Sequence, residues 1–410
     1  MILRLMAIMF ILVCATVAWL GLSATLKFRT DEADSSLSRA VGELWGKTQH
    51  QVAPSFHYQV EQKKNVLVTV DNKVVSKEET ELVPVSLPLV GSDIEARLSL
   101  DQRRKGLLWY ATYKVGFHGR FMVHNTTPEA REVFVTFAFP ASGATYDNFR
   151  LRVAGDEVTE LKIANGKVRQ AFRMEAGSKV PVEVSYDSQG LDQWWYDFGQ
   201  NVNQTRDFRL QLVTDFDGFD FPESGISPTR KERRGGGWLL EWRYGNLLTD
   251  VKIGLEMPHR LNPGPWAAMV TAAAPVSLFL FFFLVFIFTT LRGIELHPMH
   301  YFFLAAAFFS FHLLLAYLVD HISIEFALVI CSIVSLALVV SYMSRVAGLR
   351  FACLTVGTAQ MIYLVLFSAT FLLEGLTGLS ITVLCIATLF VVMQMTARLD
   401  WGKVFRRESL

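Results

Sequence analysis

The part of this 410-residue chain that lies outside its apolar runs contains no cysteine. All four cysteines lie within apolar runs, at Cys14, Cys331, Cys353 and Cys385. A soluble domain built from the remaining residues has no disulfide, even in an oxidising compartment, and depends on its core alone. Charge is also scarce, because only 19% of the residues are charged and the net charge is +1. This balance gives no support for a nucleic acid or an acidic substrate as partner.

Motifs of the common enzyme classes are missing too. The sequence has no G-x-S-x-G elbow, no H-E-x-x-H, no Walker A loop and no paired C-x-x-C. Hydrolase, zinc and nucleotide-binding interpretations therefore have no support. His118 and His124 share strand parity, but a metal site would need a third ligand near them in sequence. We expect no catalytic residue, no metal and no cofactor.

Five long apolar runs fill the last third of the chain. They are Trp266–Leu291, Tyr301–Val319, Ile322–Met343, Phe351–Leu373 and Leu376–Ala397. Each has about the twenty residues that a helix needs to cross a bilayer core, where only a helix satisfies its own backbone. Buried helices of a soluble protein would need polar stripes, which these runs lack. The sequence therefore predicts a five-helix transmembrane bundle over residues 263–410, in contact with the lipid bilayer.

A sixth apolar run, from Leu5 to Leu26, follows the basic start of the chain at Arg4. A cleavable signal peptide is the competing interpretation, because Ser23 and Ala24 are small. The run is longer than a usual signal-peptide core, and no clean A-x-A site follows it. We predict that residues 1–26 form an uncleaved transmembrane helix, which gives six such helices in all.

Basic residues at alternate ends of the runs predict the orientation. The connections after the first and third of the five runs, and the tail after the fifth, carry Arg292, Arg345, Arg350, Arg398, Lys403, Arg406 and Arg407. The other connections carry Asp320, His321 and Glu374, with neither Lys nor Arg. Because cytoplasmic loops collect Lys and Arg, both termini are predicted to be cytoplasmic. Residues 27–262 then lie on the opposite side of the membrane.

Residues 27–262 open with a helical pattern and continue with strands. Apolar residues at helical spacing predict an amphipathic helix from Asp34 to Gly46, either lying on the membrane or packing on the following domain. From Tyr58 to Glu256, alternating apolar residues and Gly-Asp or Asn-Gly turns predict short antiparallel strands. We predict an all-β, sandwich-like soluble domain inserted between transmembrane helices 1 and 2. A turn-rich hinge at Leu261–Pro265 follows it.

Two further segments of this domain allow more than one interpretation. The aromatic run Gln193–Phe198 can grip a sugar ring or lie on lipid, or it can pack in the core or at a membrane-facing edge. The basic cluster Arg230–Arg234 can meet phosphate groups at the outer surface, or it can form a solvated hairpin tip. The sequence leaves both questions open.

Polar residues inside the apolar runs are the candidate functional residues. His312, Gln360 and Tyr363 lie deep in their runs, where an ionisable side chain normally faces other helices and has a partner. We hypothesise that His312 hydrogen-bonds to Gln360 or Tyr363, as structural glue or as part of a proton pathway. At the outer surface Asp320, His321 and Glu325 can form a cation site or a proton relay, or simply a charged cap at the membrane surface.

Several motifs resemble one family. The segments Leu296–Tyr301, His312–Tyr317 with Asp320-His321, and Thr396–Trp401 look like the membrane part of the CreD family of inner-membrane proteins. Upstream, the matching motifs are Trp45-Gly46-x-x-Gln49, Arg103–Gly106 through Tyr113 with Gly119–Phe121, Met257-Pro258 and Asn262–Pro265. The similarity extends over nearly the whole chain. It departs from the family at Ala53-Pro54 and at Leu107–Tyr110.

The resemblance implies a multi-pass protein of the bacterial inner membrane, with residues 27–262 in the periplasm and a link to cell-envelope integrity. The family is associated with the regulon of a two-component system, with colicin tolerance and with the β-lactam response. It implies no catalytic residue. The sequence thus predicts a non-enzymatic protein whose periplasmic domain binds an envelope protein, lipid or glycan.

A transporter or channel-like bundle is the alternative function, with His312, Asp320, His321 and Glu325 along a path. Transporters often show inverted repeats and broken helices at the membrane midplane. Here only the helix with Pro275 is interrupted, and five helices give no obvious pair of halves. A water-sized polar cavity reaching His312 would favour transport, whereas a dry, filled interior would oppose it.

Overall fold

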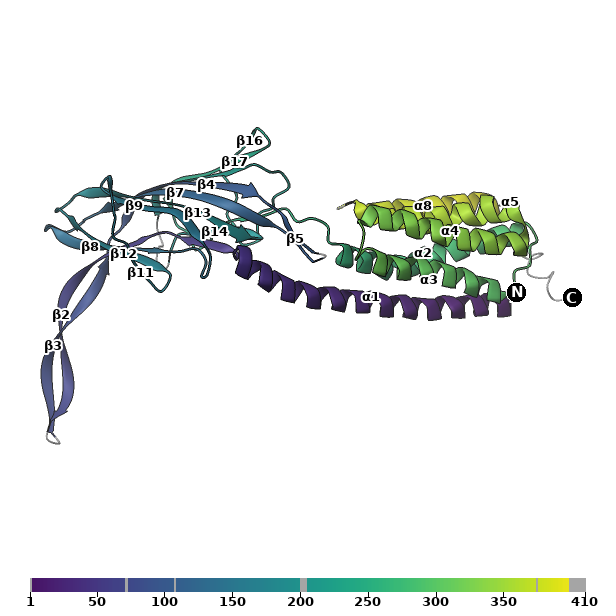
Figure 1. Cartoon of the computed structure of the whole chain (residues 1–410), viewed down its shortest axis with the longest axis horizontal. Helices are drawn as coiled ribbons and strands as arrows, with labels where there is room; N and C mark the ends of the chain where they lie inside the picture. The colour runs from purple at the N-terminus through teal and green to yellow at the C-terminus, as the bar shows by residue number, and fades with distance from the viewer. Residues whose placement is uncertain (1, 71–72, 107, 200–204, 374, 398–410) are drawn as a thin grey trace. The chain divides into compact units, whose positions relative to one another are not determined.

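The computed structural model describes residues 2–70, 73–106, 108–199, 205–373 and 375–397 (Figure 1). The chain divides into two units, Met1–Ser36 with Leu261–Leu410, and Leu37–Arg260. The predicted cytoplasmic tail after residue 397, with its basic residues, lies outside the described residues, as does Glu374.

Helices make up the first unit. They are α1 (Ile2–Trp45, whose last residues belong to the second unit), α2 (Pro263–Leu291), α3 (Pro298–Leu318), α4 (Ile324–Ala347), a stretch over Leu349–Leu372, and α8 (Thr377–Thr396). In the described part of the chain, six helices are long and apolar enough to cross a membrane. The prediction of six apolar helices together with a large β-rich domain is confirmed.

The stretch Leu349–Leu372 is irregular in a way that the sequence does not reveal. Short α-helical segments, α5 (Leu349–Phe351), α6 (Thr358–Gln360) and α7 (Phe367–Ala369), alternate with wider π-helical turns at Ala352–Gly357 and Met361–Leu366 and a final 3-10 turn at Thr370–Leu372. Such π turns occur often at functional sites and leave carbonyl groups free for other partners.

The predicted boundary inside the first helix is wrong. No helix ends near Leu26 and no separate helix starts at Asp34, because α1 continues without a break to Trp45. Residues 27–36 contain neither Gly nor Pro, and the Ser35 hydroxyl donates to the Glu32 carbonyl within the helix instead of capping a new start. The predicted stop is confirmed, since Gly46 follows the helix with a φ of +132°.

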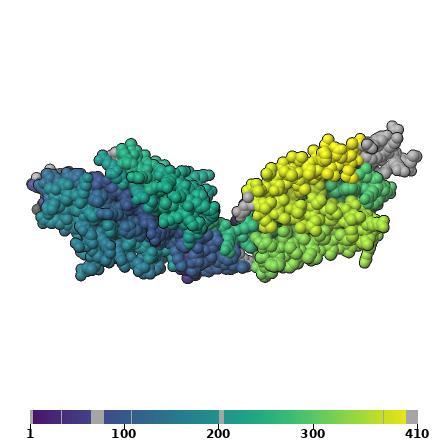
Figure 2. Space-filling model, turned by 90° about the horizontal axis from the view of Figure 1, so that it is seen from above, coloured from purple at the N-terminus to yellow at the C-terminus, as the bar shows by residue number. Residues whose placement is uncertain are grey.

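The outside of the helical unit is covered with large apolar side chains. Examples that are more than half exposed are Val17, Phe326, Val329, Leu389 and Phe390. Helix α8, drawn in yellow, runs along the surface shown in Figure 2, and only 11% of its apolar window is buried. A water-soluble unit would have to hide such a surface, whereas lipid tails solvate it.

Strands make up the second unit. Its strands are β1 (Gln49–Val52), β2 (Ser55–Val70), β3 (Lys73–Ser86), β4 (Leu89–Leu100), β5 (Arg103–Lys105), β6 (Leu108–Tyr110), β7 (Thr112–His124), β8 (Arg131–Ala138), β9 (Tyr146–Val153), β10 (Asp156–Glu157), β11 (Lys162–Ala164), β12 (Lys167–Met174), β13 (Lys179–Leu191), β14 (Gln193–Asp197), β15 (Thr205–Thr214), β16 (Arg230–Arg234), β17 (Gly237–Leu247) and β18 (Ile253–Glu256). An eight-stranded sheet has the order β10-β9-β13-β7-β4-β15-β17-β16, and a five-stranded sheet the order β11-β12-β8-β2-β3. Two small sheets, β1-β14-β18 and β5-β6, complete the unit.

The two large sheets share one core, as a sandwich requires. Phe137 from the five-stranded sheet packs against Phe149 and Tyr186 from the eight-stranded sheet, and Phe137 itself is fully buried. The predicted antiparallel pairing holds for most of the pairs, but β15 pairs with β4 in parallel, and so does β14 with β1. Parallel partners need a long crossover. In this unit, long stretches of intervening strands supply it.

Local signals in the sequence are reproduced well. Asn165 and Gly166 both have positive φ, at 51° and 69°, as a tight hairpin turn requires. The aromatic run Gln193–Phe198 belongs to the core and is not a ligand surface, because Trp194 and Tyr196 are at most 1% exposed.

The hairpin of β2 and β3 was not predicted at its full length. Beyond Tyr58, β2 pairs only with β3, and the ribbon extends away from the other strands (Figure 1).

Candidate functional site

His312 is buried among aromatic rings on α3. Its ring centroid lies 5.7 Å from that of Trp19 and 5.0 Å from that of Phe311, both edge to face. Its Nδ1 lies 3.2 Å from the carbonyl oxygen of Phe308, one turn earlier on the same helix. The hypothesis that His312 hydrogen-bonds to Gln360 or Tyr363 is wrong, because the structure gives each of those residues a different side-chain partner.

Gln360 and Tyr363 join helices through small polar side chains that the sequence analysis missed. The Gln360 amide donates to the Ser335 hydroxyl at 2.7 Å, and Ser335 donates to the Ala307 carbonyl at 3.1 Å. The Tyr363 hydroxyl lies 2.5 Å from that of Thr388. These bonds tie α3, α4 and α8 to the irregular stretch. Buried hydrogen bonds of this kind hold transmembrane helices together.

In the irregular stretch Leu349–Leu372, one backbone carbonyl group accepts a hydrogen bond from another helix. The backbone carbonyl of Tyr363, within the second π turn, accepts a hydrogen bond from the buried Ser277 hydroxyl on α2. The Gln360 Oε1 atom is buried and has no hydrogen-bond partner in the part of the chain that the structure describes. Serine and threonine within the apolar runs are the sequence signal for this network, and a prediction based on ionisable side chains does not include it.

Asp320 has a partner from the first helix. Its carboxylate lies 2.8 Å from the Arg29 guanidinium, which also donates to the Ala316 carbonyl at 3.2 Å and lies over the ring of Tyr317. Arg29 therefore neutralises Asp320 and fastens α1 to the end of α3. His321 and Glu325 are exposed. No group of three His, Cys, Asp or Glu side chains that could hold a metal ion occurs among the described residues.

One hollow of about 310 Å³ lies in the helical unit, between α3 and α4. Phe303, Ala307 and Leu338 line it together with other mostly apolar residues, and His312 is not among its lining residues. This hollow gives no polar route to His312.

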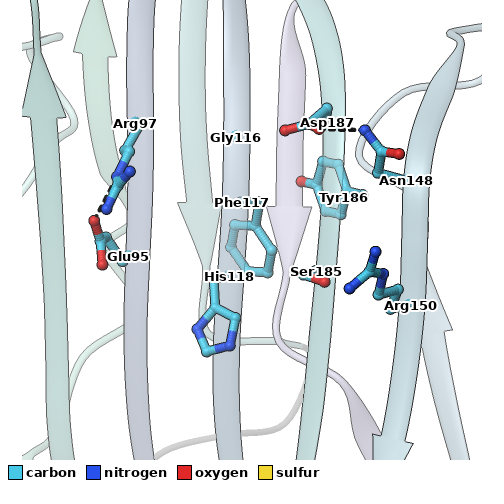
Figure 3. Close-up of a pocket in the computed structure, with 10 residues that line it drawn as sticks. All are labelled: Glu95, Arg97, Gly116, Phe117, His118, Asn148, Arg150, Ser185, Tyr186 and Asp187. Carbon is cyan, nitrogen blue, oxygen red and sulfur yellow. Dashed lines mark hydrogen bonds and ion pairs between the residues drawn. The ribbon is translucent and has the colours of Figure 1, made fainter. Parts of the chain in front are cut away.

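A polar groove crosses the outer face of the eight-stranded sheet (Figure 3). Four residues on neighbouring strands form one row across it: Glu95 on β4, His118 on β7, Ser185 on β13 and Arg150 on β9. The hollow over this row measures about 400 Å³. No two of these residues are close in sequence, so only the strand register brings them together.

Gly116 creates the depth of the groove. It lies between Arg97 and Asp187 in the next row of the sheet, and a Cβ atom at this position would stand 3.3 Å from the Asp187 carboxylate. A second hollow of about 340 Å³ shares these three residues and continues to Lys114 and Gln189. The two hollows thus form one shallow channel along β7, with the glycine in its floor.

The channel holds charges of both signs, and some of them are unpaired. Arg97 binds Glu95 at 2.6 Å, and Asn148 donates to Asp187 at 2.8 Å (Figure 3). The side chains of Arg150 and Lys114 make no ion pair or hydrogen bond with any described residue. The channel therefore offers free cationic groups to an outside ligand, beside hydroxyl, imidazole and carboxylate groups.

The motif Trp45-Gly46-x-x-Gln49 has a structural role. The Arg103 guanidinium lies 3.2 Å from the centroid of the Trp45 ring. The buried Gln49 amide donates to the Ser188 hydroxyl at 2.9 Å and to the Gln189 carbonyl at 2.7 Å. Gly46 lets the chain pass close to that same carbonyl. The motif thus fixes the start of the second unit to the end of β13.

Two titratable groups lie beside this motif in the small sheet. The His50 ring stacks on Trp195, and burial together with the nearby Lys252 lowers the pKa of the imidazole. Burial raises the pKa of the Asp197 carboxyl, but hydrogen bonds from the Lys252 ammonium and the Gly199 amide outweigh it, so that the net pKa is lowered.

Acid is expected to weaken this small sheet. Both groups bind fewer protons in the folded state than in the unfolded state, so stability falls as the pH falls. The contribution of His50 is complete above its unfolded pKa of about 6.5 and is lost as the pH drops through its lower folded value. Hydrogen exchange of β1 and β14 at pH 7.5 and 5.5 measures the loss. The variant His50→Gln should lose less stability between these two pH values than the parent. The control His124→Gln, on β7, keeps His50 and should therefore keep its contribution to the loss.

Comparisons with known proteins bear on the two units differently. A family model described as the inner membrane protein CreD matches residues 273–402, within the helical unit. Comparison with curated proteins yields no match. A solved structure from Legionella pneumophila, provisionally described as a nutrient binding protein, is 10% identical, and the match covers 58% of this chain and 76% of that one with a TM-score of 0.35.

An M1 zinc metallopeptidase from Deinococcus radiodurans is also 10% identical, with a TM-score of 0.27. This match covers 42% of each chain, so the present chain spans less than half the length of the metallopeptidase. Scores this low carry no argument about fold or activity. The family match lies in the apolar helices, where the motifs around His297, His312 and Asp320 had pointed to the same family. Over residues 273–402 this chain therefore matches the CreD family of inner membrane proteins, as the motifs in its apolar runs predicted.

Proposed function

We propose that this protein supports the integrity of the bacterial cell envelope without catalysing a reaction, by binding an envelope partner through its β-rich domain. In this proposal residues 27–262 lie in the periplasm between transmembrane helices 1 and 2, and both termini are cytoplasmic. The alternation of basic residues along the helices supports the orientation. A reporter enzyme fused at the Asn165-Gly166 turn and active only in the cytosol would contradict it.

The polar channel on the eight-stranded sheet is the observation that carries the proposal. The outer face of a solvated sheet is normally filled by its own alternating side chains. Here Gly116 leaves a gap in that layer, and at its sides lie Arg150 and Lys114, whose side chains have no ion-pair partner within the described ranges. Sites for specific ligands combine a concave shape with a few convergent polar groups.

The mixture of charges favours a partner that carries both signs. Glu95 and Asp187 lie beside Arg97 and Arg150, so a strongly anionic polymer would meet carboxylates as well as guanidinium groups. A peptide or an amino-bearing glycan of the envelope matches this pattern better, because its own charges can pair with both kinds of group.

Site-specific photo-crosslinking in cells tests the proposal. A photoreactive residue at position 118 lies in the channel, whereas one at position 124 lies on the same strand and has the same side-chain parity outside it. We expect position 118 to capture a defined envelope component, position 124 to capture none, and Gly116→Val to abolish the capture. Equal capture from both positions, or capture that persists in Gly116→Val, would count against a binding role for the channel.

A transporter or channel-like bundle is the second candidate function. The Gln360 Oε1 atom, buried and without a hydrogen-bond partner among the described residues, is the observation that favours it. Gln360 itself lies between the two π turns. Against it stand the pairing of Asp320 with Arg29 and the aromatic packing of His312. The variant Gln360→Leu distinguishes the two functions, because it should impair a transport path but leave the crosslinking from position 118 unchanged.

A further inference from the structure

Three aromatic rings on the second unit face one another at the edge of the eight-stranded sheet. The Phe219 ring is nearly perpendicular to the ring of Phe221, at 5.7 Å and 77°, and to that of Trp238, at 6.2 Å and 88°. All three side chains are only partly buried. Rings set at such angles form the walls of a corner, and we name these three residues the aromatic cage.

A cation from the same chain occupies the aromatic cage. The Lys231 ammonium, on edge strand β16, lies 4.5 Å from the ring centroid of Trp238, 4.8 Å from that of Phe219 and 5.8 Å from that of Phe221. In the described residues this ammonium has no carboxylate within ion-pair distance. The rings alone therefore hold it, through the attraction of a cation to the electron-rich ring faces.

The walls of the cage are held in place independently of Lys231. The Asp217 carboxylate accepts a hydrogen bond from the Trp238 indole at 2.5 Å and binds the Arg233 guanidinium at 2.8 Å. The Trp238 backbone amide also donates to the Thr214 hydroxyl. A site whose walls are fixed by other contacts keeps its shape when its occupant leaves, which reduces the cost of exchanging one cation for another.

Lys231 is a replaceable occupant. It is exposed on the last strand of the sheet, and its flexible side chain loses rotamer freedom when the ammonium is held. Cation–π contacts at exposed sites are weak, and cages of this kind bind methylated ammonium groups best. An outside ammonium group can thus compete for the same rings.

The surrounding charges select the type of ligand. Arg233, which also binds Asp217, lies two residues from Lys231 on the same side of β16, so a ligand carrying only positive charge would meet a second cation there and bind weakly. A ligand that carries both an ammonium and a phosphate would be favoured, because its phosphate would face the displaced Lys231 and Arg233. We propose that the aromatic cage binds the ammonium of a zwitterionic phosphorylated amino alcohol, such as phosphocholine, in place of Lys231.

The experiment uses the full chain in an uncharged maltoside detergent, with ligand-observed NMR titrations of tetramethylammonium and phosphocholine. Trp238→Leu and Phe221→Leu are expected to abolish the binding of both probes. Lys231→Gln should tighten tetramethylammonium by roughly fivefold, because a competing cation is removed, and should weaken phosphocholine. Trp109→Leu is the matched control, since Trp109 also stacks on a cation, Arg260, but with one ring only.

A second arm identifies the source of the ligand. Phosphocholine-headed lipid nanodiscs and free phosphocholine are compared for each variant. If binding to nanodiscs is tighter than binding to free phosphocholine and is lost in the cage variants, the ligand is a lipid headgroup. If only the free compound binds, and binds through the cage, the ligand is a soluble zwitterion. Both outcomes support the proposal. Binding that survives both Trp238→Leu and Phe221→Leu, or equal affinity of parent and Lys231→Gln for tetramethylammonium, overturns it.

Discussion

Replacing Gly46 by alanine is expected to destabilise the β-rich unit by about 3 kcal/mol, as the sum of backbone strain and forced displacement of neighbouring chain. The φ of Gly46 is +132°, a conformation that residues with a Cβ rarely adopt. An added Cβ would stand 2.4 Å from the carbonyl oxygen of Gln189, which is backbone and cannot swing aside. The same carbonyl accepts the hydrogen bond of the buried Gln49 amide, so a shift of β13 would break that bond as well.

Hydrogen–deuterium exchange of β13 in the full chain measures this effect locally, which suits a protein whose two units need not unfold together. A loss of about 3 kcal/mol corresponds to roughly a hundredfold faster exchange of the most protected amides. Gly245→Ala is the control, because a Cβ there meets no atom within 4 Å and the residue lacks a positive φ. If Gly46→Ala exchanged no faster than Gly245→Ala, the close approach at Gly46 would have no energetic role.

The helical part of the fold was predictable because one physical requirement dominates it. A run such as Trp266–Leu291 must be helical in lipid, whatever its neighbours are. The boundary inside α1 was missed for the opposite reason. The charged residues 27–36 resemble a loop in composition, but nothing in them breaks a helix, and the amphipathic pattern near Trp45 belongs to the same continuous helix.

The strand pattern was predictable, but the pairing of strands was not. Turns such as Asn165-Gly166 are encoded by two residues, whereas the parallel pair of β4 and β15 joins segments more than a hundred residues apart. The channel depends on that register, because Glu95, His118 and Arg150 share a row only after the sheet has formed. No local signal in the sequence marks such a row.

The candidate residues in the bundle were recognised individually, but their partners were not. Depth in an apolar run marks His312 and Gln360 as buried. Which side chains are in contact depends on the rotation and order of the helices. In the structure Gln360 hydrogen-bonds to Ser335, whereas His312 packs against aromatic rings. Arg29 shows the same limit, since its partner Asp320 lies 291 positions away in the sequence.

Substituting Gly264 by valine is expected to release α1 from α2, with a loss of about 2–3 kcal/mol from overpacking. A Cβ at Gly264 would stand 2.5 Å from the hydroxyl oxygen and 3.2 Å from the methyl group of Thr30. Thr30 is buried, and its branched side chain is stiff, so the helices must move apart. Their separation would also strain the nearby bond from the Ser23 hydroxyl to the Ala268 carbonyl.

A pair of cysteines at positions 23 and 268 reports this movement by the rate of their oxidative crosslinking in membranes. We expect a fall of at least about tenfold in Gly264→Val, which is the change that 1.4 kcal/mol produces. Gly378→Val on α8 is the control, because a Cβ there meets nothing within 4 Å. Thr30→Ala in the Gly264→Val background should recover part of the rate, since it removes both close atoms. An unchanged rate in Gly264→Val would mean that α1 is not held against α2 at this glycine, and the first helix would then be a tether and not a packed member of the bundle.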